Sequence, residues 1–181
     1  MELLKAITKR RSVRKFTDET VSRELIKEII DKARFYPSWK NSQTARFYVV
    51  DSQEVKFEIL KKATAEGGNN QKIIYGAPAL VVLTIKKGLS GTHPDGVYVT
   101  DKKDTWEMFD SGIAVQTFSL VAFEKGLGTV ILGIFDEHKV AEICNIPDDE
   151  VVAALIPIGY PRDTDLKDGV RKEVDEILKF I

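Results

Sequence analysis

The sequence predicts a mixed α/β fold in which four strands are interleaved with helices around one core. Three observations lead to this prediction. A run at residues 79–85 is apolar on both faces, as in a central strand covered by helices. Amphipathic segments with apolar residues at helical spacing precede and follow that run. The length of 181 residues suits one domain, residues 1–181, and is short for two.

The first part of the chain is predicted to form two helices before its first strand. A short helix with apolar residues at helical spacing ends near Arg10. Ser22 is a candidate N-cap for the second helix, and Pro37 prevents that helix from continuing. Residues 37–44 are small and polar apart from one tryptophan, which indicates a loop before a strand at residues 47–50.

The middle of the chain adds two helices and the central strand. Residues 53–64 show an amphipathic pattern that glycine and asparagine break at residues 67–70, and a short helical piece follows. The strand at residues 79–85 comes next. Residues 88–104 are rich in glycine and charge, so we expect them to be the least regular segment, a candidate lid or partner-facing excursion.

The last third begins with the longest predicted helix, residues 105–125, which is apolar almost all round. Such a helix is buried in a core or an interface, and Gly126 is placed to end it. Strands are predicted at residues 129–132 and 151–158, with a short helix between them. The tail, residues 162–181, is polar and then ends in apolar residues, so we expect it to dock on its own domain or on a partner.

Composition argues against several function classes. A formal net charge of −1 provides no basic field for nucleic acid, and neither a membrane span nor a signal peptide is expected. The single cysteine, Cys144, fits a reducing compartment, so the cytoplasm is the expected location. His93 and His138 lack further ligands at metal-binding spacing, so no metal is expected. Nucleophile-elbow, dinucleotide-binding and P-loop motifs are absent from the sequence, which points to chemistry supplied by a bound cofactor.

One stretch concentrates the binding chemistry, the run RRSVRKF at residues 10–16. Guanidinium groups offer planar forks of donors that match phosphate and carboxylate groups. In extended backbone alternate side chains point the same way, so Arg10, Ser12 and Arg14 would share one face. That face is suited to hold a phosphate at one end and a second electron-rich group further along. A solvated basic turn is the alternative interpretation of such a run.

This stretch resembles the N-terminal motif of the FMN-dependent nitroreductases. Four further stretches match the family in order and spacing, so the resemblance covers nearly the whole chain. They are the P-S-x-x-N-x-Q pattern at residues 37–43, the asparagines after Gly68, the helix that ends in G-L-G-T at residues 126–129, and I-G-Y-P at residues 158–161. The resemblance implies a largely antiparallel sheet, a homodimer and a C-terminal tail exchanged between the subunits.

The resemblance also implies a flavin site. It places Arg10, Ser12 and Arg171 at the FMN phosphate and ribityl chain, with Arg11 contributing mainly its backbone. It places Arg14 at the N1 and O2 edge of the isoalloxazine ring, where a cation stabilises the charge of the reduced flavin. Three further groups are implied: a loop from the partner subunit, an asparagine at the polar edge of the ring, and a segment that runs along the ring. The loop from the partner subunit supplies Pro37, Ser38, Asn41 and Gln43. The asparagine is Asn70, and the segment along the ring is Ile131, Leu132 and Gly133.

Some of these residues have plainer interpretations when taken alone. Asn41 and Asn70 are ordinary turn residues, and Gly133 is the end of a strand. The loop also departs from the family, which often continues Q-P-W where this chain reads Q-T-A from Gln43. Trp39 is the aromatic residue that would compensate for the missing tryptophan.

A second departure lies near the C-terminus. The family often has a basic residue two positions before Arg171, and Gly169 stands there in this chain. Lys167 and Lys172 are the candidate substitutes at the phosphate. The sequence does not decide between them.

The predicted function is that of an FMN-dependent oxidoreductase. It would transfer a hydride from NADH or NADPH through flavin N5 to a small acceptor, such as a nitroaromatic compound or a quinone, in ping-pong order. One alternative is a flavin-binding redox sensor with little turnover. Another is a specialised family member that acts in reductive dehalogenation or flavin fragmentation. Such a member would need substrate-binding lid residues, and residues 88–104 show no recognisable pattern of them.

Overall fold

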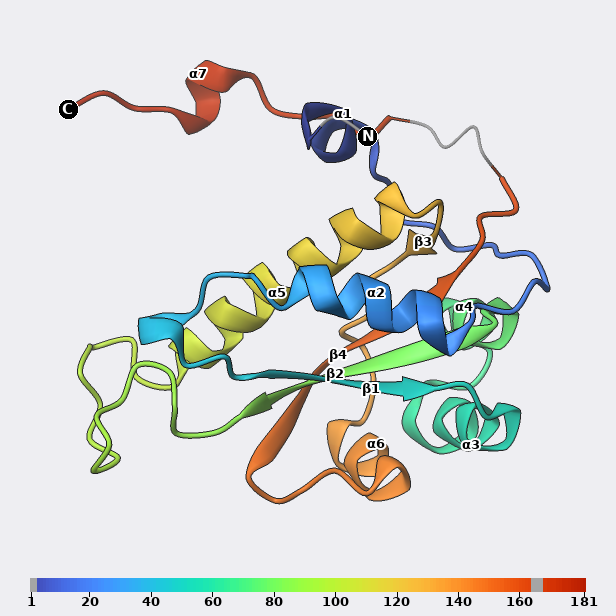
Figure 1. The fold of residues 1–181 in the computed structure, drawn as a ribbon, viewed down its shortest axis with the longest axis horizontal. Helices are drawn as coiled ribbons and strands as arrows, with labels where there is room; N and C mark the ends of the chain where they lie inside the picture. The colour runs from blue at the N-terminus through green and yellow to red at the C-terminus, as the bar shows by residue number, and fades with distance from the viewer. Residues whose placement is uncertain (1–2, 164–167) are drawn as a thin grey trace.

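The computed structural model describes residues 3–163 and 168–181 and is built around a four-stranded sheet (Figure 1). The strand order is β1-β2-β4-β3, and each neighbouring pair is antiparallel. The predicted α/β class and the largely antiparallel sheet are therefore confirmed. The strands are β1 (Ala45–Val50), β2 (Ala79–Lys86), β3 (Gly128–Thr129) and β4 (Glu150–Gly159).

Helices cover both faces of the sheet. α2 and α5 pack on one face, and α3, α4 and α6 lie on the other (Figure 1). β2 contributes alternate residues to the two cores, with Leu80 and Val82 on the α3 side and Val81 and Leu83 on the α5 side. The prediction of a central strand buried on both faces is confirmed. The helices are α1 (Leu3–Lys9), α2 (Arg23–Ala33), α3 (Gln53–Ala63), α4 (Asn69–Gly76), α5 (Thr105–Glu124), α6 (Glu137–Cys144) and α7 (Val174–Ile177), with a 3₁₀ turn η1 (Trp39–Asn41).

Two helix boundaries that had a sequence signal, at Ser22 and Gly126, agree with the structure, whereas α4 begins at Asn69, within the residues 67–70 predicted to break the helical pattern. The Ser22 side chain accepts a hydrogen bond from the backbone N–H of Leu25 at 3.1 Å, as an N-cap does. Gly126 follows α5 with φ 81°, a conformation that costs glycine little. The backbone N–H of Leu127 then donates to the oxygen of Ala122, which closes the helix end.

β3 is shorter than the predicted strand at residues 129–132, and the cause lies in β4. Thr129 pairs with Ile158, and in the same register Leu132 pairs with Leu155. In this register Val130 lies opposite Pro157 of β4, and proline has no backbone N–H to donate to the neighbouring strand. The ladder is therefore interrupted.

The run at residues 10–16 lies along β3 and the end of β4. Ser12 forms a parallel bridge with Thr129, and the backbone N–H of Val13 donates to the oxygen of Thr129 at 3.0 Å. A Cβ built on Gly128 would lie 2.4 Å from a methyl carbon of Val13, so this close approach depends on glycine. Further along, Phe16 is buried and bridges to Pro161.

Two segments stand outside these layers. Residues 88–104 are irregular apart from a bridge between Thr92 and Tyr98, as the sequence predicted for this segment. The C-terminal segment with α7 stands off from the body, and Figure 1 shows it reaching past α1 into open space. Its apolar side chains are exposed, with Phe180 92 % accessible. Among the described residues, no helix is long and apolar enough to cross a membrane.

Candidate functional site

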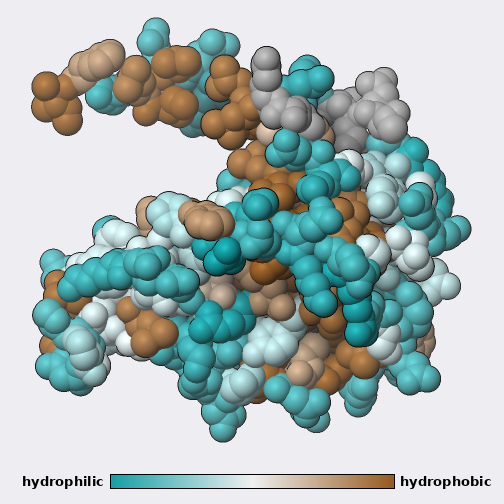
Figure 2. Space-filling model, in the orientation of Figure 1, coloured by the Kyte–Doolittle hydropathy of each residue, from teal (hydrophilic) through white to brown (hydrophobic). Residues whose placement is uncertain are grey.

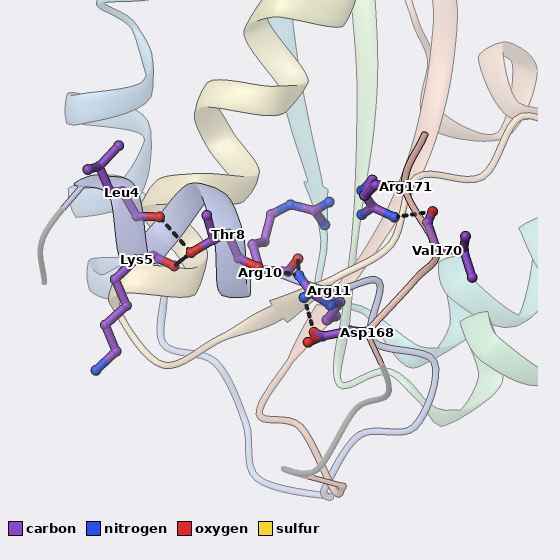
Figure 3. A network of polar contacts seen from close by, with 8 residues as sticks. All are labelled: Leu4, Lys5, Thr8, Arg10, Arg11, Asp168, Val170 and Arg171. Atoms are coloured by element: carbon purple, nitrogen blue, oxygen red, sulfur yellow. Dashed lines mark hydrogen bonds and ion pairs between the residues drawn. The ribbon is translucent and has the colours of Figure 1, made fainter. Parts of the chain in front are cut away.

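Three guanidinium groups gather where α1 ends, and we call Arg10, Arg11 and Arg171 the arginine cluster (Figure 3). The partly buried Arg10 side chain points toward that of Arg171, which comes from the C-terminal segment. Burial lowers the pKa of Arg10, and the positive charges of Arg11 and Arg171 lower it further. In the part of the chain that the structure describes, no carboxylate pairs with Arg10. An anion placed here would offset the repulsion.

Arg11 differs from Arg10 because both of its terminal nitrogens, Nη1 and Nη2, already have partners within the chain, although its Nε is buried without a partner among the described residues. Its Nη1 donates to the backbone oxygens of Thr8 at 2.7 Å and Arg10 at 2.8 Å. Its Nη2 forms an ion pair with Asp168. The hydrogen bond and the charge of Arg11 hold the pKa of Asp168 below its usual range. The Arg11 side chain therefore ties the end of α1 to the C-terminal segment.

Arg171 reaches the cluster through the space beside Gly169. Its Nη1 donates to the backbone oxygen of Val170 at 3.1 Å. A Cβ built on Gly169 would lie 2.7 Å from the same nitrogen. The guanidinium thus takes up the space where a side chain at position 169 would begin. Lys172 is exposed, and Lys167 lies outside the described residues.

Ser12 and Arg14 lie on the extended run beside β3. Ser12 is partly buried, Arg14 is exposed, and Val13 between them is 5 % accessible. This alternation follows the geometry of extended backbone. The Nη1 of Arg14 donates to the backbone oxygen of Ser12 at 3.3 Å. The run therefore presents a hydroxyl and a cation next to the arginine cluster.

The segment after β3 has an uncovered side. Ile131 is 48 % accessible, whereas its neighbour Leu132 is buried. Gly133 is exposed, and a Cβ built there would have no neighbour within 4 Å. Asn70, in the first turn of α4, donates from Nδ2 to the backbone oxygen of Ile134 at 3.0 Å and so holds the end of the segment. This arrangement leaves room for a ligand against the segment.

The loop of residues 37–43 has an unusual backbone. Lys40, Asn41 and Gln43 have φ values of 45°, 57° and 50°, which are costly for residues other than glycine. The Ser38 hydroxyl accepts a hydrogen bond from the backbone N–H of Gln43 at 2.9 Å and closes the loop. The side chains of Asn41 and Gln43 are exposed, as is Pro37 at the start of the loop.

The loop and the arginine cluster lie at opposite ends of α5 (Figure 1). In the loop, the backbone N–H of Trp39 donates to Asp110 near the start of α5. At the other end, β3 follows α5 and pairs with Ser12. A helix of 20 residues is about 30 Å long. A single chain therefore brings Arg10, Ser12 and Arg171 together but leaves the loop residues far from them.

Sequence analysis missed two buried carboxylates of α5. Asp110 is 2 % accessible and Glu107 is 7 % accessible. Glu107 accepts a hydrogen bond from the backbone N–H of Gly88 at 2.6 Å, and burial raises its pKa. The signal that would have found them is a pair of acidic residues one turn apart in a helix otherwise predicted to be apolar almost all round.

The arrangement is built for binding rather than for chemistry by side chains. The described residues include no group that could hold a metal ion. Burial raises the pKa of the Cys144 thiol to about 11, which makes it a poor nucleophile. The site offers cations for an anion, an extended polar run and an uncovered segment. These features suit a bound cofactor that supplies the reactive group.

Comparisons with known proteins show which proteins this chain resembles. A sequence profile of the Nitroreductase family matches residues 7–160. The chain is 28% identical over 175 residues to FMN reductase (NAD(P)H) of Bacillus subtilis, a match that covers 92% of this chain and 68% of that protein. The solved nitroreductase family protein from Clostridium novyi NT is 31% identical with a TM-score of 0.78, covering 93% of this chain and 89% of that one. An FMN-dependent nitroreductase from Clostridium difficile R20291 is 25% identical with a TM-score of 0.77, covering 98% of both chains.

Proposed function

The chain belongs to the nitroreductase family, and from this membership we propose that it is an FMN-dependent oxidoreductase with NADH or NADPH as electron donor. The observation that carries the proposal is Arg10, which is partly buried beside Arg11 and Arg171 and has no carboxylate partner among the described residues. A phosphate group fits this cluster because it supplies the missing negative charge and accepts bidentate hydrogen bonds. The names of the relatives, which include FMN, support the same cofactor.

Bound FMN would supply the hydride-transfer chemistry at N5, with a nicotinamide as donor and a second substrate as acceptor in ping-pong order. We propose a nitroaromatic compound or a quinone as that small acceptor. The cytoplasm is the proposed compartment, on the single cysteine. The whole chain, residues 1–181, is proposed to form one FMN-binding domain.

Each element of the site has a separate role in this proposal. Arg10 and Arg171 hold the phosphate, and Ser12 adds a hydroxyl donor next to them. Arg14 places a positive charge at the N1 and O2 edge of the ring, where negative charge gathers on reduction. Arg11 acts mainly through its ties to α1 and to the C-terminal segment.

The other proposed contacts lie along the ring. Asn70 holds the segment after β3 through the backbone oxygen of Ile134, and in this proposal it would lie at the polar edge of the ring. The buried Leu132 anchors this segment. Ile131 and Gly133 border the ring, where the absence of a side chain at Gly133 permits close approach of the backbone.

The loop of residues 37–43 enters the site from a second subunit in this proposal. Pro37, Ser38, Asn41 and Gln43 cannot reach the arginine cluster of their own chain, since α5 separates them. In a homodimer the same loop of the partner would complete the site. We therefore propose that the active form is a homodimer.

Exposed apolar surface supports this assembly. Figure 2 shows apolar side chains along the C-terminal tail, which stands off from the body. Val174, Ile177 and Phe180 are 63%, 71% and 92% accessible, an arrangement that a single chain in water does not favour. On α5, Phe109 is 59 % accessible. We propose that the tail and α5 pack on the partner and that the tail is exchanged between the subunits.

One experiment tests the cofactor and the donor together. Purified protein should show a flavin absorption spectrum, and heat should release FMN that chromatography identifies. Addition of NADH or NADPH in the absence of oxygen should rapidly bleach the visible absorption of the oxidised flavin. Release of FAD alone, or a protein that binds no flavin when FMN is supplied, would contradict the proposal. Flavin that neither nicotinamide reduces would favour a redox sensor.

A further inference from the structure

We propose that Asp110 is a positioning residue of the flavin site. It would hold the loop of residues 37–43 in the conformation that presents Asn41 and Gln43 to the flavin of the partner subunit. It would also fix the excursion at residues 88–104 to the same point. This inference rests on the proposed function, because it takes the loop to be a flavin contact.

The contacts of Asp110 carry the inference. Its carboxylate is 2 % accessible and accepts from the backbone N–H of Trp39 with both oxygens, at 3.2 and 3.1 Å. Its Oδ2 also accepts from the hydroxyl of Ser90 at 2.8 Å. A buried carboxylate is costly unless donors satisfy it. These donors come from two segments far apart in sequence, so the carboxylate joins them.

The loop needs such an anchor because its backbone is strained. Residues with positive φ persist only when their surroundings hold them, and the three in this loop, Lys40, Asn41 and Gln43, lie within four residues after Trp39. The Ser38 hydroxyl closes the far side of the loop. Asp110 holds the start of the loop, because its carboxylate accepts a hydrogen bond from the backbone N–H of Trp39.

The excursion is tied to the same end of α5. Trp39 packs on Trp106 with ring centroids 5.0 Å apart, and the indole N–H of Trp106 donates to Thr100 at 2.8 Å. One turn before Asp110, Glu107 accepts from the backbone of Gly88. The loop and the excursion therefore form one unit. If the loop reaches the flavin of the partner, residues 88–104 lie next to that flavin. They would then form one side of the pocket in which the acceptor substrate binds.

Four variants separate this role from general packing. Asp110→Ala removes both ties, and Asp110→Asn keeps an oxygen that accepts from the backbone of Trp39. Ser90→Ala removes only the tie to the excursion. Ser119→Ala is the matched control, because Ser119 is a buried serine of α5 whose hydroxyl has no hydrogen-bond partner among the described residues.

The first measurement uses protein without flavin. The electronic transitions of two indole rings 5.0 Å apart couple and give a pair of far-ultraviolet circular dichroism bands of opposite sign, the Trp39–Trp106 couplet. The Trp39→Phe variant gives the reference spectrum without this couplet. We expect Asp110→Ala to lose the Trp39–Trp106 couplet while the helical signal is kept. Asp110→Asn, Ser90→Ala and Ser119→Ala should keep the couplet. This readout does not depend on FMN or on activity.

The second measurement uses the loaded enzyme. Asp110→Ala should weaken FMN binding by about ten-fold or more and change the visible circular dichroism of bound flavin, whereas Asp110→Asn should restore both. Ser90→Ala should bind FMN like wild type and raise the KM for the acceptor with little change in kcat. Ser119→Ala should match wild type in all of these.

The outcomes distinguish the two proposals. A folded Asp110→Ala that keeps the couplet, or that loses it while flavin affinity and flavin dichroism stay at wild-type values, would overturn the positioning role. Failure of Asp110→Asn to rescue would also overturn it. A wild-type protein that binds no FMN would refute the proposed function itself, and the couplet would then be the test of whether Asp110 fixes the loop.

Discussion

The arginine cluster and the loop of residues 37–43 use polar groups in opposite ways. In the cluster, Arg10 is partly buried next to two other cations and has no carboxylate partner among the described residues. In the loop, the polar backbone groups that begin and close it are paired, with Trp39 bound to Asp110 and Gln43 bound to Ser38. The cluster thus lacks a balancing negative charge, whereas hydrogen bonds within the chain hold the loop backbone at Trp39 and Gln43.

This difference indicates what each region requires from outside the chain. The cluster requires an anion, which a cofactor phosphate would supply. Hydrogen bonds within the chain hold the backbone of the loop at Trp39 and Gln43, but the loop projects two exposed amides, Asn41 and Gln43, for which the chain itself shows no use near the cluster. The exposed amides have a use if the loop completes the flavin site at the arginine cluster of a second subunit.

Loss of the C-terminal tail should have the largest effect. A chain that ends after Arg171 keeps the cluster and the loop but loses the apolar residues of α7 and the C-terminus. If the tail holds the subunits together, dimer and bound FMN should disappear together, because obligate dimers often have no stable folded monomer. Analytical ultracentrifugation and flavin absorbance measure both. A truncated chain that stays dimeric with full flavin would remove the tail from the account.

Arg10 and Arg11 should differ strongly although they are neighbours. Arg10→Gln should weaken FMN binding by roughly 10- to 150-fold, since a hydrogen bond to a charged group contributes about 1.5–3 kcal/mol. Arg11→Gln should have a clearly smaller effect, because the terminal nitrogens Nη1 and Nη2 of Arg11 already serve Thr8 and Asp168. Fluorescence titration of FMN into the apoprotein gives both constants. Equal losses in the two variants would contradict the special role of Arg10.

Arg14 should affect reduction more than binding. If its charge lies at the N1 and O2 edge of the ring, Arg14→Gln should keep most of the FMN affinity but lower the reduction potential of the flavin. Anaerobic reduction by NAD(P)H should slow by about ten-fold. Lys15→Gln removes an adjacent exposed cation that pairs with Asp163 and is the matched control. If Arg14→Gln keeps the wild-type flavin reduction potential and the wild-type rate of reduction by NAD(P)H, then Arg14 has only a structural role.

Glu107 should give the smallest effect, on stability alone. Burial raises its pKa above the ordinary value of 4.5, so in the window just above 4.5 the folded state binds more protons than the unfolded state. The free energy of unfolding therefore falls as pH rises through that window. Glu107→Gln keeps an acceptor for Gly88 without the charge, so urea unfolding at pH 5 and pH 7 should show a smaller fall than wild type. An identical fall would mean that Glu107 does not titrate there.

Much of the fold could be predicted from the sequence because local signals agreed with tertiary packing. The run of β2 that is apolar on both faces, the Ser22 cap and Gly126 each identified an element by its own chemistry. The early end of β3 could not be predicted in the same way. It depends on Pro157, which is remote in sequence and becomes relevant only once the register of β4 is known.

The candidate site was predicted unevenly for a similar reason. Arg10, Ser12 and Arg14 belong to one run, so extended geometry alone places them together. Arg171 joins them from the far end of the chain, a contact that only the resemblance to a family suggested. Asp110 gave no local signal for its role, because its partners come from two other segments and one of them is a backbone group.

Subunit complementation tests the central claim most directly, that one site takes its arginines from one chain and its loop from the other. An Arg10→Gln chain and an Asn41→Ala/Gln43→Ala chain should each bind FMN weakly alone. When the two chains are unfolded and refolded together, each mixed dimer would combine an intact cluster with an intact loop at one of its two sites. We predict that the mixture regains high-affinity FMN at one site per mixed dimer. If the cluster and the loop of the same chain formed the site, mixing would restore nothing, and that result would contradict the account.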